Sequence, residues 1–390
     1  MSKKLKIIRV TTKPEALLIL LRGQLKFINN FHDLIGVSSP NEKLTHVMNQ
    51  EGIRVIPLDM TRKITPIKDM VALIGMIRIL RKERPDIVHS HTPKAGIIAM
   101  LASLICKVPH RLHTVAGLPL METSGFKKKI LLFIEWLTYR CATKVCPNSN
   151  GIKKFILENI SISKNKLRVI GFGSSNGVDL EYFDRSQEVN HSSLVFRKKF
   201  NLENVFSFIF IGRIVKDKGI EELLKAFLRL NREFGDIRLI ILGHEERDLD
   251  PISYESKNTL STNKNIINLG FKTDVRAFLA SSNCLVLPSY REGFPNVILQ
   301  ASSMQVASIA SDIIGCNEII HNKVNGLLFK PKNIESLYLA MKKIYLDKEL
   351  TRMLAISAKK NVIEKYNKDF IHNEILSFYS NLNNKIDEKI

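Results

Sequence analysis

Two stretches in the second half of the chain place charged side chains and glycine after an apolar run. The first, GRIVKDKG, puts Arg213 and Lys218 five residues apart, directly after Gly212 and before a helical pattern. Glycine lets a ligand approach the backbone closely, and the start of a helix offers free N–H groups. A guanidinium fork and an ammonium group suit the oxygens of a diphosphate. We therefore predict a phosphate site here; a solvated turn with surface charges is the alternative.

The second stretch, SYREGFPNVILQ, follows the apolar run CLVLPS and carries one carboxylate, Glu292. Pro295 is typical of a first helical turn, so that N–H groups after Gly293 can bind phosphate or sugar oxygens. Glu292 can accept hydrogen bonds from sugar hydroxyls. Gln300 lies about two turns into the predicted helix and could bind a ribose from there. The alternative is a polar loop with an incidental acid.

The elements that position these residues alternate between strands and helices. Apolar, β-branched runs lie at 6–12, 33–39, 53–59, 86–92, 110–117 and 143–149, and at 206–212, 237–243, 266–270, 284–289 and 307–311. Strands alternating with helices predict mostly parallel sheets, in which ligands bind beyond the carboxyl ends of the strands. We expect an α/β fold with two Rossmann-like, doubly wound domains.

The domain boundary is predicted from a change in pattern near residues 180–200. The segment SSNGVDLEYFDRSQEVNHSS has turn residues, mixed charge and little periodicity. We expect a first Rossmann-like domain over 1–185 and a second over 186–366. A C-terminal helix over 367–390 is expected to cross back to the first domain.

Taken together, GRIVKDKG and SYREGFPNVILQA resemble the nucleotide-sugar glycosyltransferases of the large retaining GT-B class, family 4. The runs DIVHSHTPKAGIIAMLASLICKVPHRLHTVAGL and NGVD extend the resemblance over nearly the whole chain. The resemblance implies that the second domain binds a nucleotide-sugar donor, usually UDP-linked. It also implies that the first domain binds the acceptor and that the two domains face each other across a cleft. It also implies transfer with retention at the anomeric carbon.

The resemblance assigns roles to the residues of both stretches. It implies that Arg213 and Lys218 hold the diphosphate and that Glu292 contacts the donor sugar, and these three are the expected catalytic residues. The expected donor-binding residues are Gly212, Arg213, Lys218, Glu292, Gly293, Phe294, Pro295, Asn296, Val297 and Gln300.

Two positions depart from the family pattern. Gln300 stands where the family has a second Glu, and a neutral amide binds a ribose hydroxyl more weakly than a carboxylate does. Ala116, in HTVAGL, stands where the family has a His near the donor sugar. His91 is our preferred candidate for an acceptor or sugar contact and His113 the second; either could instead be a packing residue.

No D-x-D motif directly follows a predicted strand, and no metal-ligand cluster stands out. We therefore expect neither a metal nor a cofactor. Departure of the diphosphate would then be helped by cationic side chains and helix N–H groups.

The charge of the chain is concentrated in its first half. Residues 1–180 contain 29 Lys and Arg against 12 Asp and Glu. This half therefore carries most of the net charge of +21 of the whole chain. An anionic partner is indicated, and the candidates are nucleic acid, an anionic membrane surface and a diphosphate-bearing substrate. The basic, aromatic segment SGFKKKILLFIEWLTYRCATK favours the membrane surface, although it could be an ordinary core-facing helix. No nucleic-acid recognition motif is present.

Other features bound the location of the protein. No apolar run reaches transmembrane length, we predict no signal peptide, and the five cysteines are scattered without a C-x-x-C pair. We expect a cytoplasmic enzyme, peripheral on the inner face of the cell membrane.

The predicted function is transfer of a hexosyl or N-acetylhexosaminyl group from a nucleotide-sugar to a glycan or a polyprenyl-diphosphate-linked acceptor, in polysaccharide or oligosaccharide synthesis. Three alternatives stay open. They are a nucleotide-sugar epimerase or hydrolase on the same fold, a non-catalytic nucleotide-sugar-binding subunit, and a nucleic-acid-binding protein.

Overall fold

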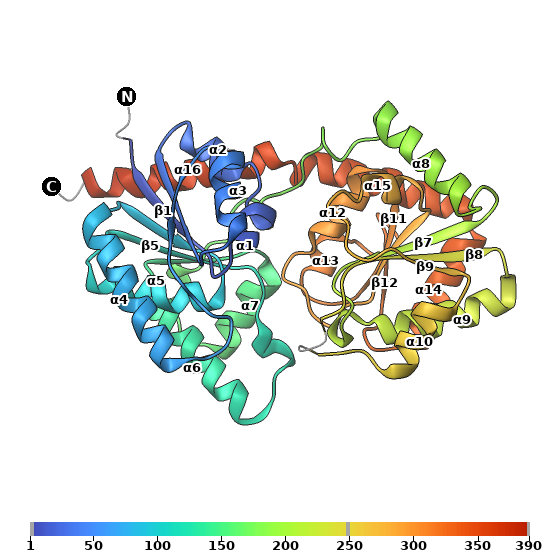
Figure 1. Ribbon diagram of the computed structural model, residues 1–390, viewed down its shortest axis with the longest axis horizontal. Helices are drawn as coiled ribbons and strands as arrows, with labels where there is room; N and C mark the ends of the chain where they lie inside the picture. The colour runs from blue at the N-terminus through green and yellow to red at the C-terminus, as the bar shows by residue number, and fades with distance from the viewer. Residues whose placement is uncertain (1–3, 247–249, 388–390) are drawn as a thin grey trace. The chain divides into compact units, whose positions relative to one another are not determined.

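The computed structural model describes residues 4–246 and 250–387 (Figure 1). The chain divides into two compact units, one formed by the residues up to Asn176 and from Lys368 on, the other by Gly177–Asn367. Residues 177–185, assigned to the first domain from the sequence, thus lie in the second unit. The reason is that Val178 is buried in its core, with its N–H donated to the carbonyl of Tyr366 (2.8 Å). The outermost three residues of the expected ranges 1–185 and 367–390 lie outside the described residues.

The first unit is built on a six-stranded parallel sheet. Its strand order is β3-β2-β1-β4-β5-β6. The bounds are β1 (Lys6–Val10), β2 (Asp33–Ser38), β3 (Arg54–Pro57), β4 (Ile87–Ser90), β5 (His110–Val115) and β6 (Lys144–Pro147). The chain reverses its winding direction between β1 and β4, and such a switch point is where doubly wound sheets bind ligands.

The helices of the first unit include one from the far end of the chain. They are α1 (Pro14–Leu20), α2 (Gln24–Asn29), α3 (Glu42–Glu51), α4 (Pro66–Glu83), α5 (Pro93–Ile105), α6 (Gly125–Cys141), α7 (Asn150–Asn159) and α16 (Lys368–Asp387), with short 3₁₀ turns η1 (Pro119–Glu122) and η2 (Lys164–Lys166). Proline opens α1, α4 and α5, where its missing N–H costs nothing. Ile371, Ile375 and Phe378 of α16 complete the core of this unit, and Figure 1 shows α16 in red beside α2.

The second unit repeats the architecture. Its six parallel strands have the order β12-β11-β10-β7-β8-β9. The strands are β7 (Phe206–Ile211), β8 (Ile237–Leu242), β9 (Ile266–Asn268), β10 (Cys284–Leu287), β11 (Ala307–Ser311) and β12 (Leu327–Phe329). The helices are α8 (Gln187–Lys199), α9 (Ile220–Phe234), α10 (Tyr254–Thr262), α11 (Arg276–Ala280), α12 (Asn296–Ser303), α13 (Cys316–Ile319), α14 (Ile334–Leu346) and α15 (Lys348–Lys365), with the 3₁₀ turn η3 (Lys216–Lys218). Strand β12, at the edge of the sheet beside β11, was not predicted from the sequence.

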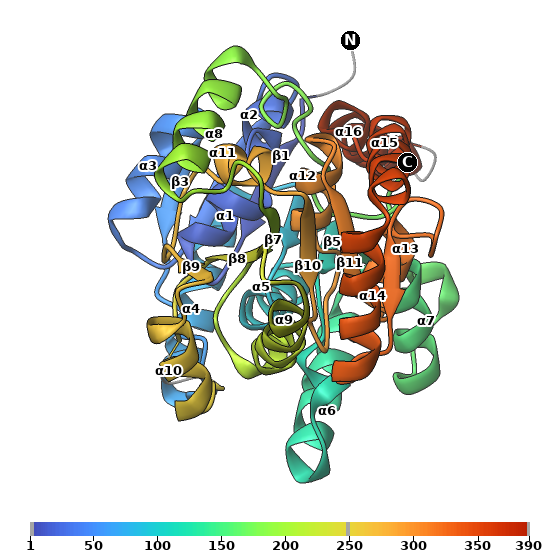
Figure 2. The same cartoon turned by 90° about the vertical axis from the view of Figure 1, so that its right-hand side faces the viewer.

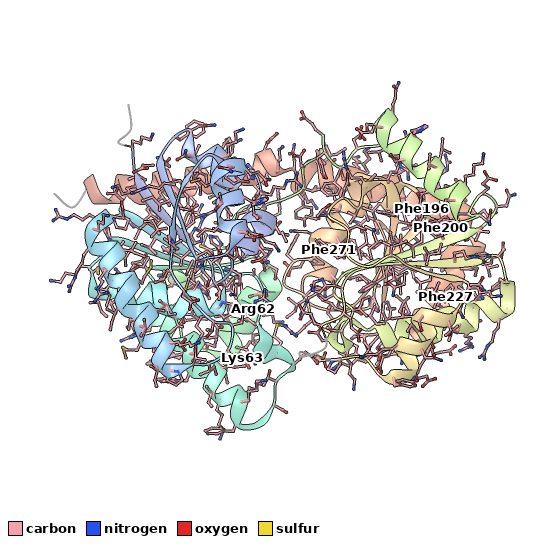
Figure 3. All side chains as sticks on the ribbon, in the orientation of Figure 1. Arg62, Lys63, Phe196, Phe200, Phe227 and Phe271 are labelled. Atoms are coloured by element: carbon pink, nitrogen blue, oxygen red, sulfur yellow. The ribbon has the colours of Figure 1, made fainter. Side chains whose placement is uncertain are left out.

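Alternate side chains of each strand in the second unit enter different cores. Phe208 and Phe210 of β7 pack with α9 and α14, which lie side by side in Figure 2, whereas Ile209 packs on the opposite face. Phe227 of α9 and Phe196 of α8, labelled in Figure 3, belong to these two separate clusters. Helices therefore cover both faces of a parallel sheet, and the predicted α/β fold of two doubly wound units is confirmed.

Candidate functional site

The carboxyl edge of the second sheet carries the predicted phosphate loop. Gly212 and Arg213 follow β7, and η3 with Lys218 leads into α9 through Gly219. Gly219 has φ +68°, and a Cβ atom placed on it would lie 2.1 Å from the carbonyl oxygen of Pro288, which follows β10. The loop after β7 and the loop after β10 thus touch at the switch point of this sheet.

That contact brings Lys218 and Glu292 together. The Nζ of Lys218 lies 2.5 Å from Oε1 of Glu292, and the hydroxyl of Ser289 donates to the same oxygen (2.7 Å). The side chains of Lys218 and Glu292 are 16% and 15% exposed, so the pair is reachable from solvent but largely screened from it. A cation and a carboxylate are therefore fixed at one point of the carboxyl edge.

Further bonds, which the sequence analysis missed, join the same two loops. Arg291 pairs with the carboxylate of Asp217 (2.7 Å), and the backbone N–H of Tyr290 donates to the carbonyl of Asp217 (2.9 Å). The hydroxyl of Tyr290 donates to Glu222 of α9 (2.6 Å). These contacts fix the relative positions of the two loops that carry Lys218 and Glu292.

Arg213 has a different partner. Its Nη1 lies 2.8 Å from Oε2 of Glu246, and Nε2 of His244 lies 3.5 Å from the other oxygen of that carboxylate. Partial burial acts to raise the pKa of Glu246, but the hydrogen bond and charge of Arg213 outweigh it, so that the pKa lies below its ordinary value. Glu246 lies in the loop after the neighbouring strand β8, where no sequence pattern marks it.

Residues 293–300 differ in what they can offer a ligand: some contribute backbone groups, some pack in the core, and some have partly exposed side chains. A Cβ on Gly315, before α13, would lie 2.4 Å from the carbonyl oxygen of Gly293. Phe294 is buried and packs on Tyr366, so it can offer a ligand only its backbone. Pro295 caps α12 rather than filling its first turn, and the helix begins at Asn296. Asn296, Val297 and Gln300 are half-buried along α12.

The two candidate histidines lie in the first unit and are buried. Nδ1 of His113 bonds the hydroxyl of Ser90 (2.8 Å), and a Cβ on Gly96 would lie 2.5 Å from the His113 ring. The ring of His91 packs against that of His89, with centroids 4.3 Å apart and the planes tilted by 33°, and its Nε2 has no hydrogen-bond partner among the described residues. His113 therefore has the contacts of a packing residue, whereas His91 keeps an unused polar atom.

His91 lines a cavity of about 20 Å³ at the switch point between β1 and β4. Arg9, fully buried in this wall, donates to Nδ1 of His89 (2.7 Å), to the hydroxyl of Tyr379 and to the amide oxygen of Gln24. The sequence analysis missed Arg9, since one cation in an apolar strand has no distinctive spacing. The space suits one water-sized molecule.

The buried histidines predict acid sensitivity. Burial lowers the pKa of His113 to about 4, and burial and neighbouring positive charge lower the pKa of His91 well below its ordinary value. The unfolded chain binds protons below pH 6.5 that the folded chain does not. We therefore expect the free energy of unfolding to fall between pH 6.5 and 5, by about 1 kcal/mol per pH unit for each such histidine.

Denaturant unfolding at several pH values measures this slope. His113→Asn should flatten it, whereas His46→Asn, on the exposed side of α3, should leave it unchanged. A free energy of unfolding that stays constant over this pH range would contradict the neutral state of the buried histidines.

Two kinds of feature are absent from the described residues. No cluster of three or more His, Cys, Asp or Glu side chains is placed to hold a metal ion. No described helix combines the length and apolar composition needed to cross a bilayer.

Comparison with known families matches both units. Residues 31–173 match the glycosyl transferase 4-like domain, and residues 193–361 match the glycosyl transferases group 1. A capsular polysaccharide biosynthesis glycosyltransferase of Staphylococcus aureus, CapM, is 31% identical over 93% of each chain. The chain therefore belongs to the group 1 glycosyltransferases and is a transferase of the GT-B class.

A second relative and a solved structure add detail. An Escherichia coli UDP-Gal:α-D-GlcNAc-diphosphoundecaprenol α-1,3-galactosyltransferase is 29% identical over 79% of this chain and 78% of its own. The structure of Anabaena HepE with UDP and glucose superposes with a TM-score of 0.81, covering 97% of this chain and 100% of HepE. At 18% identity, HepE shows the shared fold alone.

Proposed function

We propose that the chain transfers a hexosyl or N-acetylhexosaminyl group, with retention, from a UDP-sugar to a glycan carried on a polyprenyl diphosphate, in surface polysaccharide synthesis. The named activities of the relatives in Staphylococcus aureus and Escherichia coli support the acceptor class and the pathway type. The UDP-Gal donor named for the Escherichia coli relative supports the donor class. The observation that carries the proposal is the Lys218–Glu292 pair at the carboxyl edge of the second sheet.

In this proposal the second unit binds the donor. The ammonium of Lys218 and the N–H groups at the start of α9 stabilise the diphosphate as its charge grows on departure. Glu292, held by Lys218 and Ser289, keeps a free oxygen that accepts hydrogen bonds from sugar hydroxyls. A carboxylate accepts such bonds more strongly than a neutral oxygen does.

Arg213 is the second cation of the proposed diphosphate site. Its side chain is 39% exposed and paired with Glu246, which is 17% exposed. A diphosphate is a better bidentate partner for a guanidinium than a single-bonded carboxylate is. We expect Arg213 to leave Glu246 and bind the diphosphate of the donor. In the absence of donor, Glu246 would hold the Arg213 side chain close to the diphosphate site.

The proposal needs no enzymic general base. In a front-face reaction with retention, the departing diphosphate takes the proton of the acceptor hydroxyl, so Ala116 in place of a histidine does not block transfer. Charge stabilisation is assigned to side-chain cations and helix N–H groups, because Lys218 stands at the entry to α9. His91, with its unused Nε2, is the proposed acceptor or sugar contact. The protein would work at the cytoplasmic face of the cell membrane, where such acceptors are held.

A donor screen tests the proposal. Thermal unfolding of the purified protein with UDP-, GDP- and TDP-sugars should show a raised Tm for a UDP-sugar, because a ligand that binds only the folded state stabilises it. The hit is then assayed with lipid-diphosphate acceptors. Donor hydrolysis or epimerisation without transfer would favour the epimerase or hydrolase alternative, and binding without turnover a non-catalytic subunit.

Gln300 provides a test of the ribose position. Gln300→Glu is expected to keep transfer activity and to tighten donor binding by about fivefold, because a hydrogen bond to a charged group contributes about 1 kcal/mol more than a neutral one. Isothermal titration with the donor measures the change, and Gln305→Glu, beyond the end of α12, is the control. Loss of activity in Gln300→Glu would mean that this side chain does not face the ribose.

A further inference from the structure

Helix α4 carries large apolar side chains on the side that faces away from the core. Ile67, Met70, Val71 and Ile74 follow one another at helical spacing and are 83%, 57%, 66% and 44% exposed. The buried residues of this helix include Ala72, Met76 and Leu80, which lie about half a turn round from that stripe. A surface helix normally presents polar residues on its outward side. The outward stripe of α4 therefore has no explanation within the first unit.

Helix α6 also carries large apolar side chains on its outward side. Phe126, Ile130, Phe133 and Trp136 form its outward stripe and are 77%, 36%, 58% and 37% exposed. The rings of Phe133 and Trp136 stack, with centroids 5.8 Å apart. The residues buried on the opposite side include Glu135, Thr138 and Tyr139. The outward side of α6 is thus more apolar than much of its inward side.

The two stripes belong to one face of the first unit. Helix α5 packs against both α4 and α6, so that the three helices form one layer on the sheet (Figures 1 and 2). Both stripes lie mainly in the N-terminal halves of their helices. Because a helix after a parallel strand begins at the carboxyl edge of the sheet, both stripes lie toward that edge. The cavity with Arg9 and His91 lies at the same edge.

Cations surround the stripes. Lys127, Lys128 and Lys129 stand at the start of α6, whose first turn has no acidic residue. Positive charge at a helix N-terminus opposes the helix dipole and costs stability. Arg62 and Lys63, labelled in Figure 3, lie in the exposed loop before α4, and Lys68 is exposed in its first turn. An anionic surface would offset the unfavourable charge at the start of α6.

We propose that the outward stripes of α4 and α6, with these cations, form a docking face for a bilayer that contains anionic lipids. Apolar and aromatic side chains flanked by lysine are typical of helices that lie in the membrane interface. Each nearby lysine or arginine adds attraction to an anionic leaflet. Docking on this face directs the carboxyl edge of the first sheet toward a lipid-borne acceptor, and this last step rests on the proposed function.

Vesicle co-sedimentation of the full-length protein tests the docking face. Vesicles of phosphatidylcholine with about one third phosphatidylglycerol should bind the protein, and pure phosphatidylcholine vesicles should bind it at least tenfold more weakly. The variant with Ile67→Ser, Met70→Ser, Phe126→Ser and Phe133→Ser should lose binding at least tenfold, because all four side chains are exposed and would lose their burial in the bilayer. Changing Lys127, Lys128 and Lys129 to Gln should weaken binding to the anionic vesicles and reduce its dependence on salt.

A matched control is available on the second unit. Met353, Ile356 and Ile363 of α15 are also exposed at helical spacing, and changing all three to Ser should leave vesicle binding unchanged. The proposal would be overturned if the wild-type protein did not bind anionic vesicles, or if the four-residue variant bound them as well as the wild type does. A concentration-dependent dimer that the same variant abolishes, without vesicle binding, would assign the face to a protein partner instead.

Activity separates this inference from the proposed function. Transfer to a water-soluble, short-chain acceptor should be unchanged in the four-residue variant, whereas transfer to a long-chain acceptor in vesicles should fall with vesicle binding. If the wild type transfers sugar but does not bind vesicles, only the docking face is wrong. If it binds vesicles through this face but transfers nothing, only the proposed function is wrong.

Discussion

Lys218→Ala is expected to lower the rate of sugar transfer by about 10²–10³-fold, the usual effect of removing one group that stabilises developing negative charge. The ammonium contacts Glu292 at 2.5 Å and stands at the entry to α9, where the proposed diphosphate lies. Its loss removes one cation from the diphosphate and also releases the carboxylate that the sugar needs. Steady-state rates with donor and acceptor varied separately measure the effect.

Controls on the same two loops keep this prediction specific. Lys216→Ala removes an exposed lysine two residues earlier and should leave the rate within about twofold, since charges at the surface contribute little. Glu292→Ala should lower the rate by a factor comparable to that of Lys218→Ala, because the two side chains form one ion pair. Both variants should unfold near the wild-type temperature. Wild-type turnover in Lys218→Ala or Glu292→Ala would remove that residue from the site.

The pairing of Lys218 with Glu292 is the part of the site that the sequence could anticipate. The two residues lie 74 positions apart, but each follows a strand of a parallel sheet, and the carboxyl ends of such strands share one edge. Arg213 was expected beside them, and the contact with Glu246 could not be expected. That contact depends on the path of the loop after β8, for which the sequence has no periodic pattern.

The outward stripe of α4 shows a different limit. Residues 67–84 have apolar side chains at three- and four-residue spacing, which correctly predicts a helix. Apolar residues lie on both sides of this helix, however, and periodicity does not say which side meets the sheet. Packing decides in favour of Ala72, Met76 and Leu80, which are small enough or flexible enough to fit the layer. The bulkier side chains of the outward stripe, which begins at Ile67, remain exposed to solvent.

Gly219→Ala is expected to lower the free energy of unfolding by at least about 3 kcal/mol, because two separate costs add at this residue. Its φ of +68° is unfavourable for any side chain, and its Cβ would lie 2.1 Å from the carbonyl oxygen of Pro288. Neither backbone can yield without pulling α9 away from β10. The same movement would separate Lys218 from Glu292, so that donor binding should fall together with stability.

A variant at Gly235, at the other end of α9, separates the cost of the positive φ from the cost of the steric clash. Gly235 has φ +75° and nothing within 4 Å of its Cβ position, so Gly235→Ala meets the backbone penalty without the clash. We expect a loss of about 1–2 kcal/mol in Gly235→Ala, with donor binding unchanged. Denaturant unfolding and donor titration of both variants give the comparison. Equal losses in the two variants would show that the loops after β7 and β10 can separate freely, and the Lys218–Glu292 pair would then not be held by the close contact at Gly219.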